Sequence, residues 1–140
     1  MPSVTHEDVT IRPATSAELL PVMRVLDGAM LAIEEATVRA RIATDDVRVA
    51  VRRSSDRVLG AVVVDPTHDE GYWIDAIAVR SAYRGRGIGT ALIDAIGDDT
   101  TVIVAGFDAS ARPFYRSLGF EIEAASEDDR FRGRYVPDPD

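Results

Sequence analysis

The stretch from residue 72 to residue 96 constrains the fold more than any other part of this 140-residue chain. Residues 72–79 form a nearly continuous apolar run, which predicts a buried central strand. Three glycines follow within five residues, at positions 85, 87 and 89, and apolar residues then recur at helical spacing from Ile88 to Ile96. Glycines in such a turn allow the backbone to approach a ligand and to aim several N–H groups into one concavity. The pattern therefore predicts an anion site between a strand and a helix.

The local charge favours phosphate as the anion. Residues 76–93 contain Arg80, Arg84 and Arg86 and no acid, although the whole chain has a net charge of −8. The start of the following helix adds about half a positive charge, which suits a phosphate group. The alternative is a plain glycine-rich loop whose arginines are solvated.

Two other phosphate-binding motifs fit the residues poorly. A P-loop needs a lysine before its Ser or Thr, and this chain contains no lysine. A dinucleotide-binding fingerprint needs a third glycine where Thr90 stands, and it belongs to βαβ units at the start of a fold. Here the turn follows the fourth predicted strand. The sequence therefore argues against nucleotide hydrolysis and hydride transfer.

Length and composition favour one domain over residues 1–140, with loose ends at 1–8 and 137–140. The chain has no cysteine, which excludes disulfides and thiol catalysis, and 46% hydrophobic residues, which is ordinary for a globular fold. No apolar run approaches the roughly 20 residues of a membrane helix, and no secretory signal is visible. We therefore expect a cytoplasmic protein.

The charged residues are unusual in kind. All 16 basic residues are arginine, and 16 of the 24 acidic residues are aspartate. So acidic a domain should repel nucleic acid and anionic membranes, and we expect neither as a partner. An Asp-rich surface without lysine is also typical of a halophilic protein, because molar salt screens its self-repulsion. The alternative is the codon bias of a G+C-rich genome.

The hydrophobic pattern predicts the element order β-α-α-β-β-β-α-β-α-β-β. The first helix begins at a capping-box signature, Thr15 to Glu18, and ends at Gly28. Residues 66–71 read as a polar loop. This order predicts a mixed α/β (α+β) fold rather than strict βαβ alternation. The expected strands are 9–13, 47–52, 58–64, 72–79, 101–105, 120–124 and 131–136, and the other expected helices are 33–43, 88–96 and 108/110–118.

Two segments resemble one known family. Residues 84–89, Arg-Gly-Arg-Gly-Ile-Gly, resemble the R/Q-x-x-G-x-G/A signature of the GNAT N-acetyltransferases. Residues 111–120 resemble that family's A-x-x-F-Y-x-x-x-G-F segment, and the two motifs stand in the family's order. The resemblance covers residues 8–136. It implies a mostly antiparallel sheet of about seven strands with about four helices, splayed between its fourth and fifth strands.

The resemblance also implies acetyl-CoA as cosubstrate. The backbone around Ala78, mainly that of Ile77 and Val79, would pair with the pantetheine arm like an added strand. Asp108 stands where the family often has an Asn that contacts this arm, and Ser81 stands where it often has a proline. An Asp accepts hydrogen bonds but does not donate them, so that contact would differ. The pyrophosphate would lie on the backbone amides of Arg84, Gly85, Arg86, Gly87, Ile88, Gly89 and Thr90.

Tyr115 matches the tyrosine that often serves the family as general acid, giving a proton to the departing CoA thiolate. The alternative is a core tyrosine on an amphipathic helix. Asp75, on the fourth predicted strand, is the first candidate for the general base that deprotonates the amine, and Glu70 is the second. The alternative for Asp75 is an exposed or ion-paired strand carboxylate.

The implied function is transfer of the acetyl group of acetyl-CoA to a primary amine by direct attack. The acceptor would be a small amine, an amino acid, or a protein N-terminus or lysine. The alternatives are a non-catalytic acyl-CoA-binding or regulatory module of the same fold, and a purely structural domain. We expect no metal, and the resemblance also implies a homodimer. Candidates to line the acceptor site are Met30, Leu31, Glu34, Glu35, Asp128 and Asp129.

Overall fold

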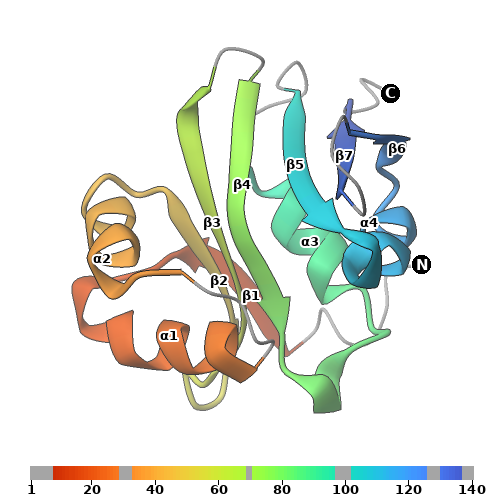
Figure 1. The fold of residues 1–140 in the computed structure, drawn as a ribbon. Coiled ribbons are helices and arrows are strands. Elements are labelled where there is room, and N and C mark those ends of the chain that lie inside the picture. The colour runs from red at the N-terminus through yellow and green to blue at the C-terminus, as the bar shows by residue number, and fades with distance from the viewer. Residues whose placement is uncertain (1–7, 29–32, 69–70, 97–101, 126–129, 137–140) are drawn as a thin grey trace.

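The computed structural model describes residues 8–28, 33–68, 71–96, 102–125 and 130–136, and contains one seven-stranded sheet with four α-helices (Figure 1). The strands are β1 (Val9–Pro13), β2 (Val47–Arg52), β3 (Val58–His68), β4 (Gly71–Val79), β5 (Ile103–Asp108), β6 (Glu121–Ala124) and β7 (Arg130–Tyr135). The helices are α1 (Leu19–Gly28), α2 (Glu35–Ala43), α3 (Ile88–Asp94) and α4 (Arg112–Ser117). The expected fold class is therefore confirmed.

The strand order in the sheet is β1-β2-β3-β4-β5-β7-β6. Every neighbouring pair is antiparallel except β4 and β5, which are parallel. Their ladder consists of Tyr72 opposite Ile103 and Trp73 opposite Val104. Figure 1 shows the two strands side by side where they begin and diverging toward their C-terminal ends. The splay expected between the fourth and fifth strands is therefore present.

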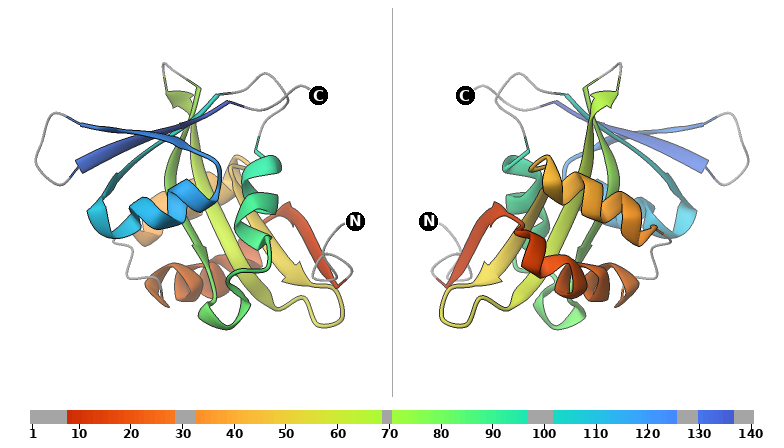
Figure 2. Two further views of the ribbon diagram at one scale, coloured as in Figure 1. Left: turned by 90° about the vertical axis from the view of Figure 1, so that its right-hand side faces the viewer. Right: turned by 90° about the vertical axis from the view of Figure 1, so that its left-hand side faces the viewer.

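Helices cover both faces of the sheet. In Figure 2, α1 and α2 lie on one side, and α3 and α4 lie on the other. Each face has its own buried cluster. Val22, Leu26 and Val38 belong to the cluster under α1 and α2, whereas Leu92 and Leu118 belong to the one under α3 and α4. Because side chains alternate along a strand, β4 contributes to both clusters.

The first strand and helix form where the local signals indicate. β1 ends at Pro13, as predicted, and the next turn begins with the predicted capping box. The Glu18 carboxylate accepts the backbone N–H of Thr15 at 3.0 Å. It also accepts two hydrogen bonds from the Arg12 guanidinium, at 2.8 and 2.7 Å. The carboxylate thus ties the start of the helical segment to the edge strand.

The predicted loop over residues 66–71 is wrong, because β3 continues to His68 and β4 begins at Gly71. Pro66 suggested a break, since proline cannot donate to a ladder. In the structure β2 is paired with β3 only as far as Val63, so at Pro66 β3 has a strand partner on one side alone. The missing N–H of Pro66 therefore breaks no hydrogen bond to β2. Two smaller differences are that β5 runs over 103–108 and α3 ends at Asp94.

Residues 1–7 and 137–140, which include almost all of the predicted loose ends, lie outside the described residues. Within the part that the structure describes, no helix is both long and apolar enough to cross a membrane.

Candidate active site

A β-bulge in β4 turns backbone groups from the second half of this strand into the splay between β4 and β5. Val63 of β3 lies opposite Ala76 and Val64 lies opposite Ile74, so Asp75 is an extra residue in β4. The backbone N–H of Tyr72, before the bulge, donates to Val102 of the β5 side at 2.9 Å. Even-numbered residues of β4 therefore turn their backbone polar groups toward β5 at this end.

Beyond the bulge the alternation is reversed. The Arg80 N–H donates to the Leu59 carbonyl at 2.8 Å, so the hydrogen-bonded pairs with β3 are 80/59, 78/61 and 76/63. The N–H and C=O groups of Ile77 and Val79 consequently point away from β3, into the splay. Their side chains, and that of Ala78, are buried. β4 thus presents a backbone edge here. The family resemblance places the pantetheine arm at this edge, and that pairing stays a prediction.

The turn after β4 depends on glycine. Gly85 and Gly87 have φ angles of 78° and 85°, in the left-handed region that favours glycine. Ile88 points into the core, and Thr90 is exposed on α3. Gly89 has a different role from the other two, because a Cβ there would lie 3.0 Å from a methyl group of Leu118. Gly89 therefore allows α3 to pack closely on the segment that follows α4.

The arginines of the turn are bound to the protein itself. Arg84 Nε donates to the Val79 carbonyl at 3.0 Å, on the splay side of β4. The Arg86 guanidinium lies 5.3 Å from the centre of the Tyr83 ring, and the Arg52 guanidinium lies 5.4 Å from it and also donates to the Tyr83 hydroxyl. These contacts hold the loop in place.

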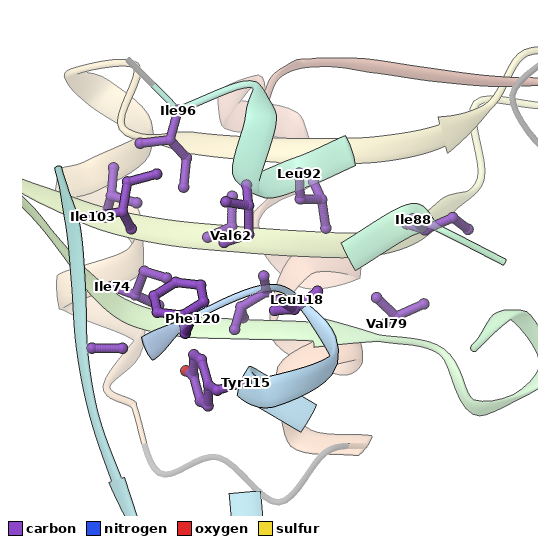
Figure 3. Close-up of a cluster of buried hydrophobic side chains, with 14 of the residues drawn as sticks. Val62, Ile74, Val79, Ile88, Leu92, Ile96, Ile103, Tyr115, Leu118 and Phe120 are labelled. Atoms are coloured by element: carbon purple, nitrogen blue, oxygen red, sulfur yellow. The ribbon is translucent and has the colours of Figure 1, made fainter. Parts of the chain in front are cut away.

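Tyr115 of α4 is buried in an aromatic cluster. Its ring stacks on Phe107 of β5, with 4.2 Å between centroids and 10° between planes. Phe114 and Phe120 contact it edge-on, with centroids 5.5 and 5.3 Å away. Figure 3 shows the Tyr115 ring beneath that of Phe120. Burial raises the pKa of Tyr115 from 10.0 to about 12, so the phenol is protonated at every physiological pH.

Asp75, at the bulge, lies in a small charge network. Arg41 of α2 donates from Nε to Asp75 Oδ2 at 3.0 Å, and its Nη2 lies 3.6 Å from Asp65 Oδ2. The Asp75 side chain keeps 20% of its surface exposed. Because its partner Arg41 belongs to α2, Asp75 lies on the α1 and α2 face of the sheet. Tyr115 belongs to the cluster on the other face. The second base candidate, Glu70, lies outside the described residues.

Asp108, at the end of β5, begins the next helical segment. Its carboxylate accepts the Ser110 backbone N–H at 3.0 Å and the Ser110 hydroxyl at 2.5 Å. The Ser110 hydroxyl, backbone N–H groups and nearby Arg130 together hold the pKa of Asp108 below its ordinary value. The side chain thus serves as a helix cap that remains exposed beside the splay.

Some residues of this region carry no motif and were not predicted. Trp73 stands where the β4–β5 ladder ends, and a Cβ on Gly106 of β5 would lie 3.0 Å from its ring. Arg41 holds Asp75, and Arg52 holds Tyr83. The sequence signal for each was only its place in an amphipathic strand or helix. Among the predicted acceptor residues, Glu34 and Glu35 are exposed at the start of α2, while Met30, Leu31, Asp128 and Asp129 lie outside the described residues.

Comparison with known proteins agrees with this geometry. A sequence model of the acetyltransferase (GNAT) domain matches residues 42–122, which is more than half of the chain. The chain therefore belongs to the GNAT acetyltransferase family. No curated protein matches the sequence.

Solved structures show the same fold at low sequence identity. A GNAT-family acetyltransferase from Bacillus cereus superposes with a TM-score of 0.75 at 12% identity, covering 92% of this chain and 97% of its own. Ard1 from Thermoplasma volcanium has a TM-score of 0.75 at 18% identity, with coverage of 93% and 98%. YncA from Salmonella typhimurium, solved with its cofactor acetyl-CoA, has a TM-score of 0.64 at 18% identity, with coverage of 95% and 99%.

Proposed function

We propose that this protein is an N-acetyltransferase that moves the acetyl group of acetyl-CoA to a primary amine. The observation that carries the proposal is the continuous path from the edge of β4 to the glycine turn. Ile77 offers its backbone N–H and C=O, and Val79 its N–H, to an extended amide-containing arm, and the left-handed Gly85 and Gly87 follow within a few residues. This order of strand edge and anion site matches the order of pantetheine and pyrophosphate in CoA.

The chemistry needs the neutral amine of the acceptor beside the thioester. The amine nitrogen attacks the thioester carbonyl, a C–N bond forms, the C–S bond breaks, and CoA leaves as a thiolate that takes up a proton. Tyr115 is our candidate for the donor of that proton, because its raised pKa keeps it protonated. Asp75 is our candidate for accepting the proton that the amine loses, with Arg41 orienting the carboxylate. Positioning by the fold supplies much of the remaining rate.

Calorimetry and an activity screen together test the proposal. Acetyl-CoA titrated into the protein should bind with one site per chain. CoA release should then be measured over a panel of small amines, amino acids and peptides with free N-termini or lysines. Turnover with at least one amine supports the proposal, whereas binding of acetyl-CoA without turnover on any amine contradicts it.

The base is tested by Asp75→Asn, with Asp65→Asn as the matched control, because both carboxylates contact Arg41. We expect Asp75→Asn to lower kcat/KM by about tenfold to a hundredfold near neutral pH and to leave acetyl-CoA affinity unchanged. Equal effects of the two substitutions would assign Asp75 a structural role through Arg41.

A non-catalytic acyl-CoA-binding module is the second candidate. The burial of Tyr115 and the ion pair of Asp75 are what such a module would also show, because both side chains already have structural partners. This candidate predicts normal binding of acetyl-CoA and no CoA release with any amine. The activity screen separates the two.

The setting of the protein belongs to the same proposal. Acetyl-CoA is a cytoplasmic metabolite, so we place the protein in the cytoplasm, acting as a homodimer. The Lys-free, Asp-rich composition suits high salt. Light scattering at low and molar KCl tests the homodimer, and CoA release in the same two buffers tests the adaptation to high salt. A halophilic dimer should keep both its mass and its activity in the molar salt.

A further inference from the structure

A pocket lined by four arginines lies beside the glycine turn, on the α1 side of the sheet. Its volume is about 290 Å³. Arg24, Val25 and Gly28 of α1 form one wall, and Arg57 contributes from just before β3. The opposite wall is the segment from Val79 to Arg84. Four arginines from three separate parts of the chain therefore line one hollow.

Two of these guanidiniums are held in place by the backbone. Arg80 Nε donates to the Val58 carbonyl at 2.7 Å, and Arg84 Nε donates to the Val79 carbonyl at 3.0 Å. Each bond uses Nε and leaves the terminal nitrogens for other partners. Arg24 and Arg57 are exposed at the rim. The pocket thus combines two fixed cations with two adaptable ones, an arrangement that suits a planar or tetrahedral oxyanion.

The charge around this pocket lacks the usual compensation. Asp27 and Asp56 are close to Arg24 and Arg57 in sequence, yet none of the ion pairs found among the described residues involves Arg24, Arg57, Arg80 or Arg84. This is unexpected in a chain with 24 acids and 16 bases. Like charges repel when they are brought together, so such a cluster is more stable with an anion bound.

We propose that this arginine pocket binds an oxyanion, a carboxylate or a phosphate, carried by one of the two substrates. The inference rests on the proposed acetyltransferase function. Because Arg84 belongs both to the pocket and to the start of the glycine turn, the group bound here would be a neighbour of the pyrophosphate. Its two sources are the 3′-phosphate of CoA and an acidic group on the acceptor amine.

The first measurement uses inorganic phosphate as the probe. Phosphate is titrated into the wild type and into Arg24→Gln, Arg57→Gln and the control Arg39→Gln, with phosphorus NMR as the readout. Arg39 is an exposed arginine on α2 that pairs with Glu35, so its removal changes the net charge equally. We expect the affinity to fall about fivefold to tenfold in the first two variants and to stay constant in the third. Equal affinity in all four proteins overturns the proposal.

The second measurement identifies the source of the anion. Calorimetry compares CoA with its 3′-dephospho form in the same four proteins. If the 3′-phosphate binds here, the wild type prefers CoA by about tenfold, and Arg24→Gln and Arg57→Gln reduce that preference while Arg39→Gln does not. If the acceptor supplies the group, an amino acid is acetylated with a lower KM than its amide, and the same two variants remove the difference.

The outcomes separate this inference from the proposed function. A protein that binds no CoA at all refutes the acetyltransferase proposal, and the phosphate titration then tests the pocket alone. A protein that binds and uses acetyl-CoA with the same affinity and KM values in all four forms keeps its function and refutes the arginine pocket. Because Arg24 and Arg57 are exposed, the variants should fold, and their unfolding curves verify this.

Discussion

The glycine turn and the environment of Tyr115 are both parts of the candidate site, but they are built differently. The turn offers backbone groups, whose directions follow from the positive φ angles of Gly85 and Gly87. The bulge in β4 likewise sets the directions of the backbone groups of Ile77 and Val79 just before the turn. Tyr115 works through a side chain whose properties come from distant residues, above all the stacked Phe107 of β5. A motif can specify the first kind of site locally, whereas the second kind depends on tertiary packing.

The largest effect on activity should come from the side chain of Tyr115. We expect Tyr115→Phe to lower kcat about a hundredfold, because the departing thiolate loses its proton donor, with acetyl-CoA affinity changed by less than about twofold. Steady-state kinetics and calorimetry measure the two quantities. Phe114→Leu, next to it on α4, is the control for disturbed packing. Full turnover by Tyr115→Phe would show that the tyrosine is only part of the core.

The same burial predicts a loss of stability in alkali. The pKa of Tyr115 is raised to about 12 in the folded protein, so folding favours the protonated phenol. The stabilisation is complete below the unfolded pKa of about 10 and is lost as pH rises toward 12, by about 2 to 3 kcal/mol in total. Urea unfolding between pH 8 and pH 11 should fall less steeply for Tyr115→Phe than for the control Tyr72→Phe. Parallel curves for the two variants would contradict the buried environment.

Two substitutions at Gly85 test the glycine turn. A Cβ on Gly85 would meet nothing within 4 Å, so a side chain there tests the φ angle of 78° alone. We expect Gly85→Val to weaken acetyl-CoA binding about tenfold or more, because a β-branched residue resists the left-handed region. Gly85→Asn should cost much less, because Asn tolerates that region. Calorimetry on both variants decides the matter, and equal losses would mean that the side chain blocks the ligand instead.

The smallest effect concerns the entry to the turn. Ser81 stands where the family often has proline, and Arg80 before it has ψ of 140°, which a following proline accepts. Ser81→Pro should therefore raise the free energy of unfolding by about 0.5 kcal/mol. Ser55→Pro is the matched control and should destabilise, because the Ser55 N–H donates to Arg52 at 3.1 Å. Urea unfolding measures both, and a destabilised Ser81→Pro would disprove this view of the turn.

Most of the fold could be predicted because local signals agreed with the tertiary structure. Pro13 ended β1, the Thr15 and Glu18 pair began the helical segment, and the glycine turn separated β4 from α3. Pro66 misled the prediction, because whether a proline interrupts a strand depends on which neighbours that strand has at that point. No local sequence pattern indicates how far β2 extends along β3.

Less of the candidate site was predictable. The bulge at Asp75 is a property of the pairing between β3 and β4, and the partner of Asp75 is Arg41, 34 residues earlier. Arg24 and Arg57 carry no motif, and only the fold brings them to Arg80 and Arg84. By contrast, Gly85 and Gly87 lie in a motif that can be read without knowing any partner.

The two-residue ladder between β4 and β5 has a thermodynamic consequence. Beyond Trp73 the two halves of the sheet are joined by side-chain packing and not by further ladder pairs within the described residues. A ligand that pairs with Ile77 and Val79 therefore acts as an extra strand, and its binding free energy adds to the stability of the fold. At a concentration a hundred times its dissociation constant it would contribute about 2.7 kcal/mol. The resistance of this protein to heat and proteolysis would then follow the acetyl-CoA supply of the cell.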